Sequence, residues 1–362
     1  MRKIELSYTW AGRGGPRLIR NARMDLLQAV KECGSISTAA RSLHLSYRHV
    51  WGELKRWEAE LGQALIVWDK GQPARLSEFG LKLLWAERQA QARLAPQIEA
   101  LHADLERAFC VAFDDAVQVL AFFASHDDAL AALRDHALAS AGLHLDIRFC
   151  GSVDAISALN EGRCVMAGFH VPATPAVGTL AQRTYQPLLQ PGRHKLIGFA
   201  RRSQGLIVAP GNPLGLDSLA DVAARQARFV NRALGTGTRI LLDDLLAQAG
   251  LGPSDIRGYG ITEPSHAAVA QAVVSGVADA ALGIEAAARP RGLAFVPLLQ
   301  EDYYLVCLKA ALDEPPVRAL LQVLQGSEWR SRVAALPGYQ PGPCGQVLSL
   351  RRQLPWWSLP PR

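Results

Sequence analysis

The chain lacks several patterns that would assign it to common classes of protein. No stretch of about twenty apolar residues occurs in it, and its start, MRKIELSYTWAGRGG, has no apolar signal core, so neither a membrane span nor a secretory leader is predicted. Its six cysteines form no CxxC pair and have no histidine at metal-ligand spacing, which favours reduced thiols over a metal site. A G-x-S-x-G elbow and a GK[ST] phosphate loop are also missing. These absences predict a cytoplasmic protein that has no membrane partner and requires no metal or cofactor.

The chain also lacks an excess of acidic residues, and its excess of basic residues is confined to the N-terminal end. The formal net charge is +6, and residues 1–85 contain 14 Lys and Arg against 8 Asp and Glu, which leaves 25 against 25 in residues 86–362. A basic segment is where a polyanion binds. The charge distribution therefore points to nucleic acid as the partner of the N-terminal segment.

The stretch from Ser35 to Gly62 predicts two helices separated by a turn. The first is short and capped by Ser37 or Thr38, and Ser46 is expected to cap the second. An apolar stripe runs along the second helix at Val50, Leu54, Trp57 and Leu61. The opposite face and its entry carry the predicted DNA contacts Ser46, Tyr47, Arg48, His49, Lys55 and Arg56. A recognition helix presents its N-terminal side chains to base edges and its basic flanks to phosphates.

Residues 65–76 predict a hairpin with a turn at Lys70-Gly71-Gln72-Pro73, which would form a wing beside the second helix. Lys70 and Arg75 lie near its tip and are the remaining predicted DNA contacts. The alternative is an ordinary amphipathic helical hairpin with a solvated charged face.

Particular residues of this segment resemble the winged helix-turn-helix of the molybdate-responsive ModE family, which is itself similar to the LysR type. They are Ser35-Ile36-Ser37, Ala39-Ala40, Leu43, Leu45-Ser46-Tyr47, Trp51, Glu58 and Leu61-Gly62. The resemblance covers roughly residues 4–110 and implies that Tyr47, Arg48 and His49 face the bases. ModE proteins also carry small molybdate-binding β-barrel domains, which the rest of this chain does not resemble, so their ligand is not simply transferred.

The flanks of this segment have regular patterns. Alternation of Ile4, Leu6, Tyr8 and Trp10 predicts a short strand, and residues 22–33 predict a helix. Ser77 is expected to cap a long helix over residues 78–107, with Pro96 as a kink or break. The resemblance implies that this helix forms a homodimer, or a tetramer of paired dimers, that reads an inverted repeat in double-stranded DNA. Packing of the helix on its own chain is the alternative.

Beyond residue 116, short apolar runs alternate with amphipathic helices, which is typical of parallel α/β units. The predicted strands are 117–123, 145–149, 165–169, 196–200, 227–230, 280–284 and 304–308. The predicted helices include 127–139, 152–159 and 239–249.

Small polar groups follow these strands, at the sheet edge where ligands bind in open parallel sheets. The loop from Asn231 to Arg239 is glycine-rich and lies between a strand and a helix that Thr238 is expected to cap. A structural turn is the alternative. The predicted ligand-binding residues are Ser125, His126, Ser152, His170, Arg232, Thr236, Gly237, Thr238, Arg239 and Tyr303. Glu263, Ser265 and His266 lie on a loop that would also reach them, and for each residue a cap or core hydrogen bond is the alternative role.

Three segments, GSVDAISALNEGRCVMAGFHV, FVNRALGTGTRILLDDLL and VVSGVADAALGIEAAA, resemble the periplasmic-binding-protein-like domain that accompanies helix-turn-helix regulators and molybdopterin-biosynthesis proteins. The resemblance implies two lobes with a ligand between them, and we expect the chain to cross between lobes near residues 200–210 and 297–306. The resulting fold class is α/β. The predicted parts are a winged helix-turn-helix (1–85), a linker helix (86–115), a two-lobed sensing domain (116–345) and a tail (346–362). We expect residues 337–362 to drape over a lobe, with an exposed tail or a partner contact as the alternatives.

The function predicted is a dimeric, ligand-responsive transcription regulator. The resemblances point to molybdate, tungstate or a molybdopterin-type species as the effector, whereas the arginines and histidines would also suit a phosphorylated or carboxylated organic anion. An enzyme with a fused DNA-binding domain and an architectural DNA binder without a ligand are the alternatives. Ser125-His126-Asp127 are consecutive and do not easily converge as a catalytic triad.

Overall fold

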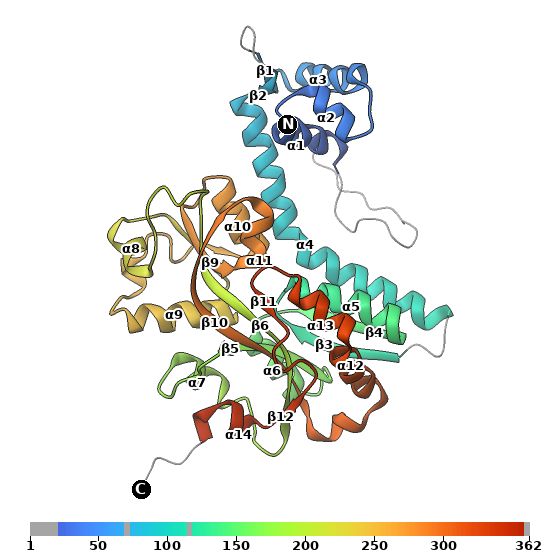
Figure 1. Cartoon of the computed structure of the whole chain (residues 1–362), viewed down its shortest axis with the longest axis vertical. Coiled ribbons are helices and arrows are strands. Elements are labelled where there is room, and N and C mark those ends of the chain that lie inside the picture. The colour runs from blue at the N-terminus through green and yellow to red at the C-terminus, as the bar shows by residue number, and fades with distance from the viewer. Residues whose placement is uncertain (1–20, 69–72, 114–117, 358–362) are drawn as a thin grey trace. The chain divides into compact units, whose positions relative to one another are not determined.

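The computed structural model (Figure 1) describes residues 21–68, 73–113 and 118–357. The chain divides into two compact units between Ala95 and Pro96. The predicted strand around Ile4–Trp10 and the wing-tip residue Lys70 lie outside the described residues.

The N-terminal unit is a helix-turn-helix followed by a hairpin, as predicted. Its elements are α1 (Ala22–Cys33), α2 (Ile36–Ser42), α3 (Tyr47–Leu61), β1 (Ile66–Val67) and β2 (Arg75–Leu76). β1 and β2 pair antiparallel, with Ile66 opposite Leu76. Leu27, Val30 and Val50 are fully buried because the helices bring their apolar stripes together around one core.

The caps of these helices confirm one prediction and correct another. Ser46 caps α3, and its hydroxyl accepts a hydrogen bond from the His49 N–H at 3.1 Å. The cap of α2 is Ser35, not Ser37 or Thr38. Ser35 has the extended backbone that a cap needs, and its hydroxyl accepts from the Thr38 N–H at 3.1 Å.

A single long helix, α4 (Glu78–Phe113), follows the wing. The Ser77 hydroxyl accepts a hydrogen bond from the Gly80 N–H at 2.9 Å, which confirms Ser77 as its cap. The helix continues through Pro96 and beyond the predicted end at Arg107.

The C-terminal unit is built on one mixed sheet, in the order β4-β3-β5-β10-β6-β9-β7-β8. Its strands are β3 (Gln118–Ala124), β4 (Leu143–Phe149), β5 (Met166–Pro172), β6 (His194–Val208), β7 (Phe229–Arg232), β8 (Thr262–Glu263), β9 (Ala280–Ile284) and β10 (Ala294–Leu308). The prediction of parallel α/β units holds within each half of the sheet. The sheet as a whole is mixed, because β10 runs antiparallel to β5 and β6, and β6 runs antiparallel to β9.

The two long strands β6 and β10 join the two halves of the sheet (Figure 1). β10 pairs with β5 through residues 301–307, and β6 pairs with β9 through residues 204–208. Both predicted crossings, near 200–210 and 297–306, lie on these strands. Strands β3, β4 and β5 are parallel in one half, and β7, β8 and β9 are parallel in the other.

Helices pack on the sheet through alanine and leucine side chains. They are α5 (Asp128–Ala141), α6 (Ser152–Asn160), α7 (Leu180–Tyr185), α8 (Leu219–Ala224), α9 (Gly237–Gln248), α10 (His266–Val274), α11 (Glu285–Ala288), α12 (Pro315–Gln325), α13 (Ser327–Ala334) and α14 (Leu350–Gln353). One core lies around α5, α10 and α12, a second around α6 and α7, and a third around α8 and α9.

The C-terminal segment belongs to this unit rather than forming a free tail. β11 (Tyr339–Gln340) and β12 (Val347–Leu348) both pair with β6. Leu350, Leu354 and Trp356 are at most 4% exposed. The expectation that this segment drapes over the sheet domain agrees with this packing as far as residue 357.

None of the helices among the described residues is both long enough and apolar enough to span a membrane. The cysteines at positions 33, 150, 164, 307 and 344 are free thiols.

Candidate functional site

Helix α3 presents a polar face to solvent at its N-terminal end. Tyr47, Arg48 and His49 are exposed there, in the first turn after the Ser46 cap, while Val50 and Leu54 on the opposite face are buried. Further along, Arg56 forms an ion pair with Glu53 at 2.7 Å, and Arg75 on β2 is exposed. These residues share one unit and have the arrangement that a recognition helix and wing require.

Glu58 ties the wing to this helix. Its Oε1 accepts hydrogen bonds from the backbone N–H groups of Leu65, at 2.8 Å, and Ile66, at 3.0 Å, and its Oε2 pairs with Lys55 Nζ at 2.7 Å. Partial burial opposes the charged form, but the hydrogen bonds from Lys55 and the two N–H groups outweigh it and hold the pKa of Glu58 below its ordinary value. Lys55, predicted to contact phosphates, is therefore already paired.

The C-terminal unit contains a buried group of polar side chains, here called the polar cluster. Its members are Ser125, Ser152, His170, Arg202, Gln204, Arg232, Thr238, His266, Glu301 and Tyr303, each no more than 8% exposed. They come from the ends of β3 and β7, the first turns of α6, α9 and α10, and the middle of β5, β6 and β10. The sheet brings these segments together because strand ends and helix starts meet at one edge.

Strand register explains two of the contacts. His170 on β5 lies directly opposite Tyr303 on β10, and their ring centroids are 3.8 Å apart. Arg202 on β6 lies opposite Glu301 on β10, and its Nε donates to the Glu301 carboxylate. Arg202 also donates to Asp127, whose other carboxylate oxygen caps α5.

A hydrogen-bond chain leads from these strands to α9 and α10. Gln204 Nε2 donates to Glu301 Oε1 and to Thr238 Oγ1, at 3.0 Å each. Thr238 Oγ1 lies 3.5 Å from His266 Nε2. One chain of polar contacts thus links the long crossing strands to the helix starts of the second half of the sheet.

Close backbone approach completes the arrangement. A Cβ placed on Gly237 would lie 3.3 Å from His170 Cβ, so only a glycine leaves ordinary space between the start of α9 and β5. The Ser125 and Ser152 hydroxyls are 3.5 Å apart. The cluster therefore spans both halves of the sheet.

Several polar atoms of the cluster have no hydrogen-bond partner among the described residues. They are His170 Nε2, His266 Nδ1, Arg232 Nε, Gln204 Oε1 and Tyr303 Oη. Buried polar atoms in folded proteins nearly always have a partner in the chain, in water or in a ligand. A small polar ligand would supply such partners.

Arg232 is the most unusual member electrostatically. It is 2% exposed, its Nη1 donates to the Glu263 backbone carbonyl at 3.1 Å, and among the described residues it forms no ion pair with a carboxylate. Burial, aided by the charge of Arg202, lowers its pKa from the ordinary arginine value to about 9. A bound anion would reverse this penalty.

The two histidines are neutral donors or acceptors rather than cations. Burial lowers the pKa of both His170 and His266 well below the ordinary value, and the positive charges of Arg202 and Arg232 lower it further. Neutral imidazoles offer one N–H each without adding charge.

Other predicted ligand-binding residues have different contacts. His126 lies 3.2 Å from Glu99 and packs against Phe149. The Arg239 guanidinium lies 3.4 Å from Asp243 and 3.9 Å from the ring centroid of Tyr259.

The α9 loop also differs in detail from expectation. Thr236, not Thr238, caps α9, because its hydroxyl accepts from the Arg239 N–H at 3.4 Å. Thr238 follows inside the helix, where its hydroxyl is left for Gln204. Ser265 caps α10, and His266 is the first residue of that helix.

Arg202, Gln204 and Glu301 were missed from the sequence. The signal was the polar run Arg201-Arg202-Ser203-Gln204 inside an otherwise apolar strand at the predicted crossing. His170 was placed at a strand end, but β5 continues to Pro172, so His170 lies within the strand.

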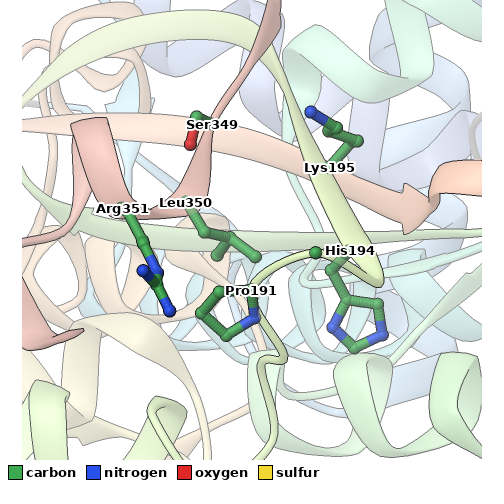
Figure 2. A pocket seen from close by; sticks show the side chains of 7 residues that line it. Pro191, His194, Lys195, Ser349, Leu350 and Arg351 are labelled. Atoms are coloured by element: carbon green, nitrogen blue, oxygen red, sulfur yellow. The ribbon is translucent and has the colours of Figure 1, made fainter.

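A separate cavity lies beside the C-terminal segment (Figure 2). It is lined by Pro191, Gly192, His194, Lys195, Ser349, Leu350 and Arg351, none of which belongs to the polar cluster. Burial, with help from the charge of Arg193, lowers the pKa of His194 to about 4, so this imidazole is neutral. In Figure 2 the Lys195 and Arg351 side chains lie on different sides of the cavity, which gives no converging charge.

Two protein families match this chain. Residues 133–325, more than half of it, match the family described as "PBP superfamily domain", and residues 22–81 match "Bacterial regulatory helix-turn-helix protein, lysR family". The second match covers α1 to the start of α4.

Individual proteins are similar over parts of the chain. A Bacillus subtilis protein described as "Uncharacterized protein YvgK" is 30% identical over 201 residues, which is 56% of this chain and 64% of that protein. A Clostridium pasteurianum protein described as "Uncharacterized protein in ferredoxin 2Fe-2S gene 5'region" is 32% identical over 111 residues, 30% of this chain and 98% of that one. The solved structure of a Corynebacterium glutamicum OxyR C206 mutant is 17% identical, covers 87% of this chain and 94% of its own, and has a TM-score of 0.44, a likeness too distant to support a functional argument.

Proposed function

We propose, from the premise that this chain belongs to the PBP superfamily and carries a regulatory helix-turn-helix of the lysR family, that it controls transcription by binding operator DNA in response to a small anion. The chain is a regulator and not an enzyme, as its helix-turn-helix family indicates. Because it acts on chromosomal DNA, we assign it to the cytoplasm.

Arg232 is the observation that supports an anionic effector. A buried guanidinium without a carboxylate partner among the described residues is costly, and a ligand that brings the negative charge removes that cost. The N-terminus of the twelve-residue helix α9 lies beside it in sequence and favours negative charge through its free N–H groups.

The donors of the polar cluster, some paired and some unpartnered among the described residues, favour a small oxyanion. Hydroxyls of Ser125, Ser152 and Tyr303, two neutral imidazoles and one guanidinium would surround several oxygens, which suits a tetrahedral anion. Molybdate and tungstate are the first candidates, because the helix-turn-helix residues resemble ModE and the segments of the C-terminal unit resemble a domain that accompanies molybdopterin-biosynthesis proteins. A molybdopterin-type compound or another phosphorylated or carboxylated molecule is the second. No other cofactor is needed for this function.

The anion would act on DNA binding through the two long strands. Within the polar cluster, Arg202 and Gln204 lie on β6 and Glu301 lies on β10, the two strands that join the halves of the sheet. Ligand binding that favours one arrangement of the halves changes the free energy of any DNA-binding state coupled to it. We further propose a homodimer, or a tetramer of dimers, formed through α4, which carries an exposed Leu101, and an inverted-repeat operator.

Thermal unfolding of the full chain tests this function directly. Molybdate, tungstate, sulfate, phosphate, formate and molybdopterin-type compounds are added one at a time, and each stabilising compound is then tested for its effect on binding to operator DNA selected from random duplexes. An anion that raises Tm and changes DNA affinity is the expected result. Selective DNA binding without any responding anion would leave a ligand-free DNA binder, and turnover of a compound would indicate an enzyme.

A further inference from the structure

Aromatic side chains gather where the recognition helix meets the wing. Tyr47, Trp51 and Lys55 lie at successive turns along one face of α3, and Trp68 follows β1. The Tyr47 and Trp51 rings are stacked with centroids 6.4 Å apart, and the Trp68 ring meets the edge of Trp51 at 4.9 Å. These four residues are here called the aromatic row.

Lys55 packs over the rings of this row, although its side chain is 44% exposed. Its Nζ lies 4.8 Å from the Trp51 ring centroid and 5.2 Å from that of Trp68, and it pairs with Glu58 at 2.7 Å. A cation held over two aromatic faces and neutralised by a carboxylate stabilises the junction between helix and wing. The exposed surface of the row is therefore largely aromatic, and the charge of Lys55 beside it is paired with Glu58.

Two of these aromatic side chains are half exposed and are not buried in the core of the N-terminal unit. Tyr47 is 51% exposed and Trp68 is 48% exposed, although both are large and partly apolar. Next to Tyr47 in sequence are Arg48 and His49, which are exposed at the start of α3. This helix lies in the segment that matches the lysR-family helix-turn-helix. An aromatic surface at that place would suit the one apolar feature of the major groove, the C5-methyl group of thymine.

We propose that Tyr47 and Trp68, supported by Trp51, contact thymine methyl groups and so determine part of the operator sequence. This inference rests on the proposed DNA-binding function. Arg48 would supply hydrogen bonds to base edges, whereas the aromatic row selects thymine by apolar contact.

Replacement of thymine by deoxyuridine tests the proposal, because it removes only the methyl group. Operator duplexes are selected from random DNA with the full-length wild-type protein, and each thymine is then replaced singly. Burial of one methyl group predicts that affinity falls about fourfold at one or more positions. The wild-type measurement alone decides whether methyl groups are read.

Variants identify the residues that read them. In Tyr47→Ala or Trp68→Ala, affinity should fall and the effect of deoxyuridine should disappear at the position that each residue contacts, whereas Tyr47→Phe and Trp68→Phe should retain much of it. Val177→Ala, which shortens a 66% exposed side chain in the C-terminal unit, is the control and should change neither. Circular dichroism confirms that each variant is folded.

The outcomes separate this inference from the proposed function. A selected operator with no position sensitive to loss of its methyl group, or a sensitivity that persists in both alanine variants, overturns the thymine assignment and leaves DNA reading intact. Affinity lost equally at every sequence would also overturn it. Failure to enrich any sequence would contradict the proposed function itself, and the inference with it.

Discussion

Replacing Arg232 by glutamine should make the ligand-free protein more stable and insensitive to its anion. Burial, with the nearby charge of Arg202, lowers the pKa of Arg232 by roughly three to four units, to about 9. At about 1.4 kcal/mol per pKa unit, the charged guanidinium destabilises the folded state by roughly 5 kcal/mol. Loss of the hydrogen bond to the Glu263 carbonyl and of packing offsets about 3 kcal/mol of that. The expected net gain is about 2 kcal/mol.

Calorimetry and urea unfolding of the full chain measure this change. A gain of about 2 kcal/mol should raise the Tm of the C-terminal unit by about 4–8 °C. An anion at one hundred times its Kd should stabilise the wild type by about 2.7 kcal/mol and the variant by nearly nothing. The variant should thus be more stable than the wild type without the anion, yet should gain almost no stability when the anion is added. A general loss of structure would lower the stability of the anion-free variant instead.

Arg239→Gln is the matched control. Arg239 is also buried, at 5% exposed, but it lies 3.4 Å from Asp243 and over the Tyr259 ring. Its removal should therefore cost about 1–3 kcal/mol and leave the anion response intact. If Arg232→Gln destabilises the protein as Arg239→Gln does, or still responds to the anion, the charge of Arg232 is compensated within the chain and the argument for an anion site fails.

Three further predictions follow from named contacts. Glu58→Ala leaves two buried backbone N–H groups without their acceptor, so the N-terminal unit should lose about 1–3 kcal/mol in urea unfolding and operator affinity should fall, unlike in Glu58→Gln, which keeps an acceptor oxygen. Burial lowers the pKa of His170 and His266, so at low pH the unfolded chain binds protons that the folded chain does not bind. Tm should therefore fall as the pH drops below about 6.5. An unchanged dependence of Tm on pH in His266→Gln would contradict this. Arg48→Ala should reduce discrimination between operator and random DNA while leaving Tm unchanged, and equal discrimination in a gel-shift titration would remove Arg48 from base reading.

Local sequence patterns were sufficient to predict the second helix of the helix-turn-helix and the hairpin that follows it. The apolar stripe of α3, the Ser46 cap and the hairpin after it depend on residues a few positions apart, so periodicity and capping predict them. The same holds for the strands around residues 145–149, 280–284 and 304–308, whose apolar runs mark their centres but not their ends.

The mixed sheet could not be predicted in the same way. Apolar runs of β6 and β10 resemble those of buried parallel strands, and nothing in the alternation of side chains records the direction of a neighbour. The true length of both strands was hidden by the polar residues inside them, which look like a strand end until their partners are known.

The sequence by itself determined the helix-turn-helix with its capped second helix, the centres of most of the long strands, and the basic N-terminal segment, because each depends on short-range backbone and side-chain preferences. Only the tertiary structure decided which polar residues meet. Strand register places His170 against Tyr303 and Arg202 against Glu301. Packing of α9 places Arg239 over the Tyr259 ring, whereas Arg232 has no carboxylate partner among the described residues. The reason is physical: a polar residue has the same local preferences in either place, and the cost of burying its charge is set by neighbours that lie far away in the chain.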